Sequence, residues 1–232
     1  LSFAINTYFT GMDPVAMKAT NIAIHVVNAW LIAGMLRALF ELCTVNGRTV
    51  MHPRVLAWGI AAAWALHPIN VMGVLYIVQR MESLSHLFVF GGLWLYFVGR
   101  LRQLRGQNGH WHIGIGLLGG TALGLLCKES GVLLPLYAWL AEMCLPMLRQ
   151  APDRRRIQRL FAAILWLPFV AGMCWLMPRV LRPTAYGNRE FTLVDRLLTE
   201  PRVLFDYIEW TLVPRLKEFA LYHDDYVVSR SL

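Results

Sequence analysis

The chain has 232 residues, of which 57% are hydrophobic and 16% are charged. Soluble domains have roughly 45–50% apolar and about 25% charged residues, so this composition excludes an ordinary soluble enzyme and predicts a membrane protein. The net charge of +8 would suggest nucleic acid in a soluble protein. Here short basic loops between apolar segments explain the charge, because such loops set the orientation of membrane helices. We therefore expect no nucleic-acid partner.

The apolar segments predict an all-α fold, a polytopic bundle of transmembrane helices with about six spans. A helix needs about 20 apolar residues to cross a bilayer core of about 30 Å. The expected spans are residues 21–40, 55–66, 84–98, 113–127, 132–148 and 160–177. We expect 1–177 to form the membrane core. The more polar residues 178–232 should form a segment on the outer face, with an interfacial helix at 203–213.

Arginines cluster after the first, third and fifth expected spans, which places all of them on one side of the membrane. They are Arg37, Arg48, Arg54, Arg100, Arg102, Arg105, Arg149, Arg154, Arg155, Arg156 and Arg159. Basic loops stay in the cytoplasm. The polar stretch 67–82, the pair Lys128–Glu129 and residues 178–232 should then all lie on the outer face.

Two patterns predict contacts between the spans. Glycines recur every four residues in the fourth span, and such small residues let helices approach closely. They are Gly116, Gly120 and Gly124. Polar residues recur near helical spacing in the first span, so that face should contact protein rather than lipid. They are Asn21, His25 and Asn28.

The stretch 65–82 is dense in polar groups between two apolar runs, which is typical of either a plain loop or a site. Arg80 carries a planar fork of donors suited to phosphate, which Glu82 could hold in place. An ordinary interfacial ion pair is the alternative. His67 precedes Pro68 and is either a capping residue or a proton shuttle.

Two further polar groups have a functional and a plain interpretation. Lys128, with Glu129 beside it, either anchors a helix end at the interface or holds a lipid-linked phosphate. The acidic cluster His223, Asp224 and Asp225 is either a solvated turn or a site for a base or a divalent metal. No motif indicates a metal or another cofactor, so the cofactor stays unassigned from the sequence.

Several segments together resemble a known family. They are NIAIHVVNAWL (21–31), ALHPIN (65–70), QRME (79–82), CKESGVLLPLYAWL (127–140) and YIEWTLVPRLKEFALYHDD (207–225). The chain resembles the GT-C glycosyltransferases, in the branch that holds the transmembrane and tetratricopeptide-repeat O-mannosyltransferases and their bacterial relatives. The resemblance implies transfer of a sugar, with inversion, from a polyprenyl-phosphate-linked donor in the membrane lipid to a protein or glycan acceptor. It also implies a bacterial inner-membrane protein whose site faces the periplasm.

The resemblance assigns roles to the polar positions. His67 and Glu82 are expected to be catalytic, and Arg80, Lys128 and Glu129 are expected to bind the donor phosphate. Relatives often have glycine at the position of Gln79 and aspartate at that of Glu82, so this chain departs from the pattern there.

The family's catalytic aspartate lies in the first outer loop, which is expected upstream of Leu1, with this chain a fragment of a longer protein. A flippase or transporter of lipid-linked glycans and a non-catalytic scaffold subunit are the alternative functions.

Overall fold

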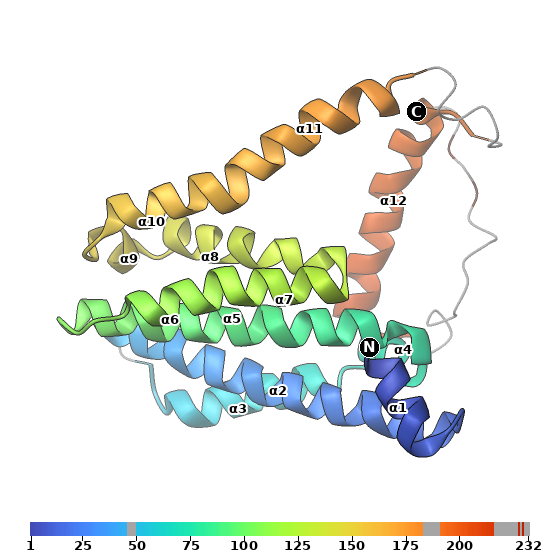
Figure 1. Cartoon of the computed structure of the whole chain (residues 1–232), viewed down its shortest axis with the longest axis horizontal. Helices are drawn as coiled ribbons and strands as arrows, with labels where there is room; N and C mark the ends of the chain where they lie inside the picture. Colours follow the sequence, from blue (N-terminus) through green and yellow to red (C-terminus); the bar gives the residue numbers. More distant parts are fainter. Residues whose placement is uncertain (46–49, 183–190, 216–226, 228, 230–232) are drawn as a thin grey trace. The chain divides into compact units, whose positions relative to one another are not determined.

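The computed structural model describes residues 1–45, 50–182, 191–215, 227 and 229. Contacts group them into two units, Leu1–Leu167 and Pro168–Leu232, which are described separately. Every regular element among these residues is helical, as Figure 1 shows. The all-α fold class is therefore confirmed.

The first unit opens with α1 (Ser2–Thr10) and the long helix α2 (Pro14–Val45). The start of α2 explains why it extends beyond the expected span 21–40. The Asp13 carboxylate accepts hydrogen bonds from the backbone amides of Val15 at 3.0 Å and Ala16 at 3.2 Å. Pro14 occupies the first helical position, where its missing N–H costs nothing.

The chain then folds back through α3. Three short helical elements connect α3 to the long helix α5. In chain order, this stretch comprises α3 (Pro53–Ala65), η1 (Pro68–Asn70), α4 (Val71–Leu75), η2 (Ile77–Gln79) and α5 (Arg80–Leu104). The remaining elements of this unit are α6 (His110–Gly114), η3 (Ile115–Gly119), α7 (Gly120–Cys127), η4 (Glu129–Val132), α8 (Leu133–Cys144), α9 (Pro146–Gln150), α10 (Arg154–Phe161) and η5 (Ala162–Trp166).

Four helical stretches in the described part of the chain are long and apolar enough to cross a membrane, or five if the bent pair Pro53–Ala65 and Pro68–Leu75 forms one span. The four are Pro14–Thr44, Ile77–Leu104, His110–Cys127 and Arg154–Val180. The sequence predicted about six. Residues 132–148 are absent from both counts, because the extended Leu145 and the following Pro146 divide the segment into α8 and α9. The expected span 55–66 qualifies only as part of the bent pair.

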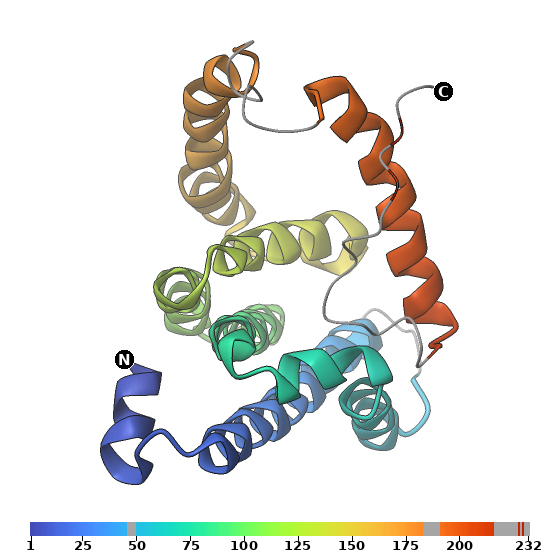
Figure 2. The same cartoon turned by 90° about the vertical axis from the view of Figure 1, so that its right-hand side faces the viewer.

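Helix α5 lies at the centre of the first unit, against α2 on one side and against α6, α7 and α8 on the other (Figures 1 and 2). It supplies much of the buried core, to which α2, α6, η3, α8, α9 and α10 also contribute. Fully enclosed members of this core include Val89, Tyr96, Leu117, Leu134 and Leu148.

The glycine pattern of the fourth span marks the contact between α5 and the α6–α7 helix, as predicted. A Cβ on Gly116 would lie 2.6 Å from the Gly92 carbonyl oxygen of α5. A Cβ on Gly120 would lie 2.8 Å from the Leu134 side chain and 3.0 Å from the Phe88 carbonyl oxygen. The two helix backbones therefore approach more closely than any other residue type permits.

Replacing Gly120 with leucine should lower the free energy of unfolding by at least 1–3 kcal/mol, the usual cost of overpacking a filled core. The measurement is thermal or denaturant unfolding of the protein in detergent or bicelles. Gly114→Ala is the matched control, because a Cβ there meets nothing within 4 Å. Equal stability of the two variants would mean that the glycines do not set the helix contact.

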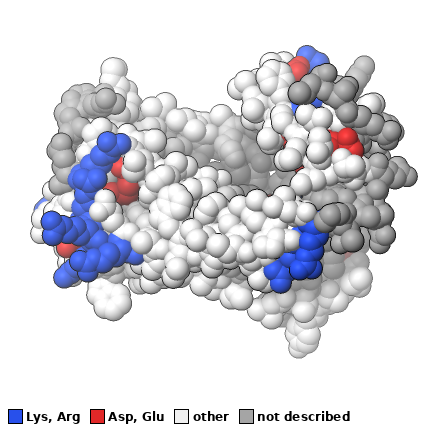
Figure 3. Space-filling view, turned by 90° about the horizontal axis from the view of Figure 1, so that it is seen from above, with Lys and Arg blue, Asp and Glu red and all other residues white. Residues whose placement is uncertain are grey.

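Unit 1 has two chemically different ends. At one end, the C-terminal ends of α2 and α5 lie near α9 and the start of α10, and arginines from these elements gather there (Figure 3). At the other end, α1, the turns after α3, the start of α5 and the turn after α7 come together. Two of the polar segments predicted to share one face, 67–82 and Lys128–Glu129, therefore lie at one end of this unit.

The second unit contains most of α11 (Leu167–Val180) and all of α12 (Leu193–Leu212). Helix α12 begins well before the expected interfacial helix 203–213, because Thr192 and Asp195 form a reciprocal capping box. Its apolar side chains are exposed. That this helix lies in the membrane interface stays a prediction. They include Val194, Leu197, Leu204, Phe205, Ile208 and Leu212.

Candidate functional site

The stretch between α3 and α5 is a bend in the chain that local hydrogen bonds hold in shape. Helix α3 and the segment Pro68–Leu75 meet at 53°. The residue before a proline favours extended backbone, and His67 is extended, with its Nδ1 accepting from the Ile69 amide at 3.3 Å. Asn70 Nδ2 donates to the Trp64 carbonyl at 2.6 Å. His67 thus caps η1, which is the local role that the sequence left open for it.

The polar stripe of α2 fastens this bend to the rest of the unit. Asn21 Nδ2 donates to the Val74 carbonyl at 3.2 Å, and Asn28 Nδ2 donates to the Ser83 carbonyl at 2.9 Å. His25 Nε2 lies 2.9 Å from the last carbonyl oxygen of α3. The stripe therefore faces protein, as predicted, and it gives partners to the Ala65 and Val74 carbonyls, which lie at the C-terminal ends of α3 and α4.

Arg80 lies at the first position of α5 and its side chain is fully buried. Its guanidinium donates to Asn21 Oδ1 at 2.8 Å, to the Met17 carbonyl at 2.9 Å and to the Ser2 carbonyl at 3.4 Å. It also lies 4.6 Å from the centroid of the Phe3 ring. Arg80 therefore bonds to residues of α1 and α2, and these hydrogen bonds take the place of the expected contact with Glu82.

Glu82 instead meets the turn after α7. Lys128 Nζ lies 2.6 Å from Glu82 Oε2, and His86 Nε2 lies 3.7 Å from Glu82 Oε1. We call Glu82, Ser85, His86, Lys128 and Ser130 the Glu82–Lys128 cluster. The side chains of Lys128 and Glu82 are 32% and 27% exposed, so the pair is reachable from outside.

A tight turn places Lys128 in this cluster. Helix α7 ends at Cys127, and the backbone of Lys128 is extended. Gly124 and Gly131 pack against each other so closely that a Cβ on Gly131 would lie 2.4 Å from the Gly124 carbonyl carbon. The Ser85 hydroxyl donates to the Gly124 carbonyl, and the Ser130 hydroxyl donates to Ser85, both at 3.2 Å. Two serines therefore tie the turn to α5 directly beside the ion pair.

The other candidate residues do not join this ion pair. Glu129 is exposed next to it. The predicted acidic cluster of His223, Asp224 and Asp225 lies outside the described residues. No group of three histidine, cysteine or acidic side chains in the described part of the chain could hold a metal ion.

Sequence reasoning missed a second charged network at the opposite end of the unit. Arg100 is fully buried and donates to both carboxylate oxygens of Glu142, at 2.8 and 3.2 Å. It also donates to Gln103 Oε1 at 2.6 Å and to the Leu148 carbonyl at 2.8 Å, while the Tyr96 hydroxyl bonds to Glu142. The signal in the sequence was present, because Tyr96, Arg100 and Gln103 recur at helical spacing on one face of α5.

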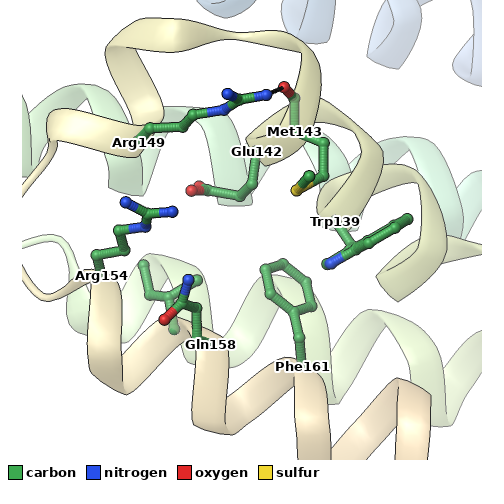
Figure 4. A pocket seen from close by; sticks show the side chains of 8 residues that line it. Trp139, Glu142, Met143, Arg149, Arg154, Gln158 and Phe161 are labelled. Carbon is green, nitrogen blue, oxygen red and sulfur yellow. Dashed lines mark hydrogen bonds between the residues drawn. The ribbon is translucent and has the colours of Figure 1, made fainter.

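Figure 4 shows the small pocket beside this network, where Glu142 and Arg154 point toward each other and Arg149 extends to the Met143 carbonyl oxygen. Its volume is about 40 Å³, enough for a few water molecules. It is lined by Trp139, Glu142, Met143, Arg149, Arg154, Ile157, Gln158 and Phe161. Because Arg100 neutralises Glu142 and Arg149 donates to the Met143 carbonyl, the network links α5 to α8 and α9 and has no room for a sugar.

No family model matches the chain, and no solved structure matches it. The sequence is similar to that of a protein O-mannosyl-transferase. Over 154 residues it is 26% identical to Protein O-mannosyl-transferase Tmtc1 of Drosophila melanogaster. The match covers 66% of this chain and 16% of that protein, so the chain spans a small part of the length of the relative.

Proposed function

We propose that this chain belongs to a membrane glycosyltransferase and that the Glu82–Lys128 cluster binds the phosphate of a lipid-linked sugar donor. One observation carries the proposal: Lys128 is a partly exposed cation at the end of the unit opposite the arginine clusters, held 2.6 Å from a single carboxylate. The similarity to a protein O-mannosyl-transferase supports a transferase. The candidate spans support a donor that is itself a membrane lipid.

The cluster suits a phosphate leaving group. In the empty site, Glu82 and Lys128 neutralise each other. A donor phosphate competes with Glu82 for the ammonium, and it gains negative charge as the bond from the anomeric carbon to its oxygen breaks. Lys128 therefore contacts the phosphate more strongly in the transition state than in the bound donor, which accelerates the chemical step. Glu82 is then a positioning residue that returns Lys128 to its place.

The remaining candidates receive supporting roles. Arg80 holds α1 and α2 to the start of α5, only two residues before Glu82. His67 holds the bend after α3. Glu129 is exposed in the turn beside Lys128.

The test is sugar transfer by the full-length protein in lipid vesicles, with a polyprenyl-phosphate-linked sugar as donor and a peptide as acceptor. The expected result is glycosylated peptide that forms only when the donor is present. Movement of the donor across the bilayer without transfer would instead show a flippase. If the protein neither binds the donor nor transfers the sugar, a non-catalytic scaffold subunit is the remaining function.

The proposed site lies on the outer face of the membrane, and the side can be tested by labelling. Single cysteines at Gln107 and Glu129, both exposed, should react with an impermeant maleimide from opposite sides. The background is a variant without the native cysteines, which are Cys43, Cys127, Cys144 and Cys174. We expect Glu129 to be labelled from outside. Labelling of both positions from one side would contradict the proposed topology.

A further inference from the structure

A groove between α2 and α5 lies at the arginine end of the first unit, and no role considered so far uses it. Its volume is about 390 Å³, within the range of small-molecule sites. The residues that matter for its chemistry are Gly34, Arg37, Glu41, Trp94, Arg102 and Arg105. We propose that this groove binds an anionic glycerophospholipid of the adjacent leaflet, with the phosphate among the arginines and an acyl chain along Trp94.

The charges at the mouth of the groove favour an anion. Glu41 accepts from Arg37 at 3.1 Å and from Arg105 at 3.3 Å, so one carboxylate holds two guanidinium groups. Arg102 Nε donates to the Asn108 carbonyl at 3.1 Å, which fixes the third guanidinium at the same rim. Three cations face one anion, and the local charge of +2 is complementary to a lipid phosphate with an acidic headgroup.

The deeper part of the groove is apolar. Trp94 lies flat against Gly34, where a Cβ would come within 2.9 Å of the indole ring. Because an α-helix rises 1.5 Å per residue, Trp94 lies about 16 Å along α5 from Arg105. Val98, Leu101 and Ala38 line the space between them. A site that is cationic at one end and apolar at the other matches a phospholipid better than a soluble phosphate.

The ion pairs at the mouth of the groove also indicate which substitutions should weaken lipid binding without unfolding the protein. Arg102 and Arg37 can each lose charge while Arg105 still pairs with Glu41, so the fold should be retained. Arg155 is a matched control, because it is an exposed arginine of α10 outside the groove. One basic residue near an anionic lipid should change affinity roughly fivefold.

The experiment measures binding of phosphatidylglycerol and phosphatidylcholine to the purified full-length protein in detergent, by native mass spectrometry and by the shift in melting temperature. We expect phosphatidylglycerol to bind and to raise the melting temperature more than phosphatidylcholine does. Arg102→Gln and Arg37→Gln should each weaken phosphatidylglycerol binding about fivefold. Arg155→Gln should leave it unchanged.

Three results would overturn the inference. Equal binding of the two lipids would show that the lipid charge plays no role. If Arg155→Gln weakened phosphatidylglycerol binding as much as Arg102→Gln and Arg37→Gln do, the lipid would be attracted to the basic surface in general and not to the groove. Stabilisation by soluble glycerol phosphate to the same extent as by phosphatidylglycerol would show a soluble-anion site. The inference does not depend on the proposed transferase activity, because the readouts are binding and stability.

Discussion

Replacing Lys128 with alanine should reduce sugar transfer by the full-length protein about a hundredfold or more, the usual effect of losing one charge-stabilising donor. The reason is that the ammonium contacts the phosphate most strongly as the sugar departs, so its loss acts on kcat. Folding should be largely retained, because the side chain is partly exposed and the turn is held by Ser85, Ser130 and Gly124. The measurement is steady-state transfer, with the melting temperature checked in parallel.

Two further variants make this prediction specific. Lys18→Ala removes an exposed lysine near the start of α2, at the same end of the unit, and should leave transfer unchanged. Glu82→Gln leaves Lys128 without its carboxylate and should reduce transfer less than Lys128→Ala does, since Glu82 only positions the ammonium. Full activity in a well-folded Lys128→Ala protein would mean that this lysine is a membrane anchor.

The architecture was readable from the sequence because its signals are local. Apolar segments of sufficient length gave the helices, and the four-residue spacing of Gly116, Gly120 and Gly124 correctly identified a close helix contact. Clusters of arginine separated the two ends of the first unit. These patterns need no knowledge of which residues meet across the bundle.

The partners of the charged residues could not be read in this way. The sequence suggested that Glu82 would hold Arg80, because only one residue separates them. Both lie at the start of α5, however, and residues two apart on a helix point to different sides. Arg80 therefore faces α1 and α2, while Glu82 faces the turn that carries Lys128. Arg80, predicted to bind the donor phosphate, is thus buried between α1, α2 and α5, whereas Glu82, predicted to be catalytic, forms an accessible ion pair with Lys128.

The division of the fifth expected span has a similar cause. Residues 132–148 are apolar apart from Glu142, which indicated one continuous helix. Pro146 cannot continue the hydrogen bonding of α8, and Leu145 before it is extended. This break turns the chain so that the Leu148 carbonyl meets Arg100, a contact between residues far apart in the sequence. Composition alone cannot show such a contact.

Replacing Arg100 with methionine should lower the free energy of unfolding by about 3–5 kcal/mol, the cost of breaking a buried ion pair and leaving one charge without its partner. Glu142 would remain beside the core, and the Leu148 carbonyl would lose its donor. The measurement is denaturant unfolding in bicelles. The control is Arg196→Met in α12, which removes an exposed i,i+4 pair with Glu200 and should cost no more than about 1 kcal/mol.

The double variant Arg100→Met/Glu142→Met separates the charge from the shape of the side chains. If the cost comes from the uncompensated carboxylate, the double variant should be more stable than Arg100→Met, because apolar side chains of similar volume can replace a buried pair. The coupling energy from the double-mutant cycle should then exceed 1 kcal/mol, as for residues in direct contact. Additive effects of the two substitutions would show that the network does not join α5 to α8.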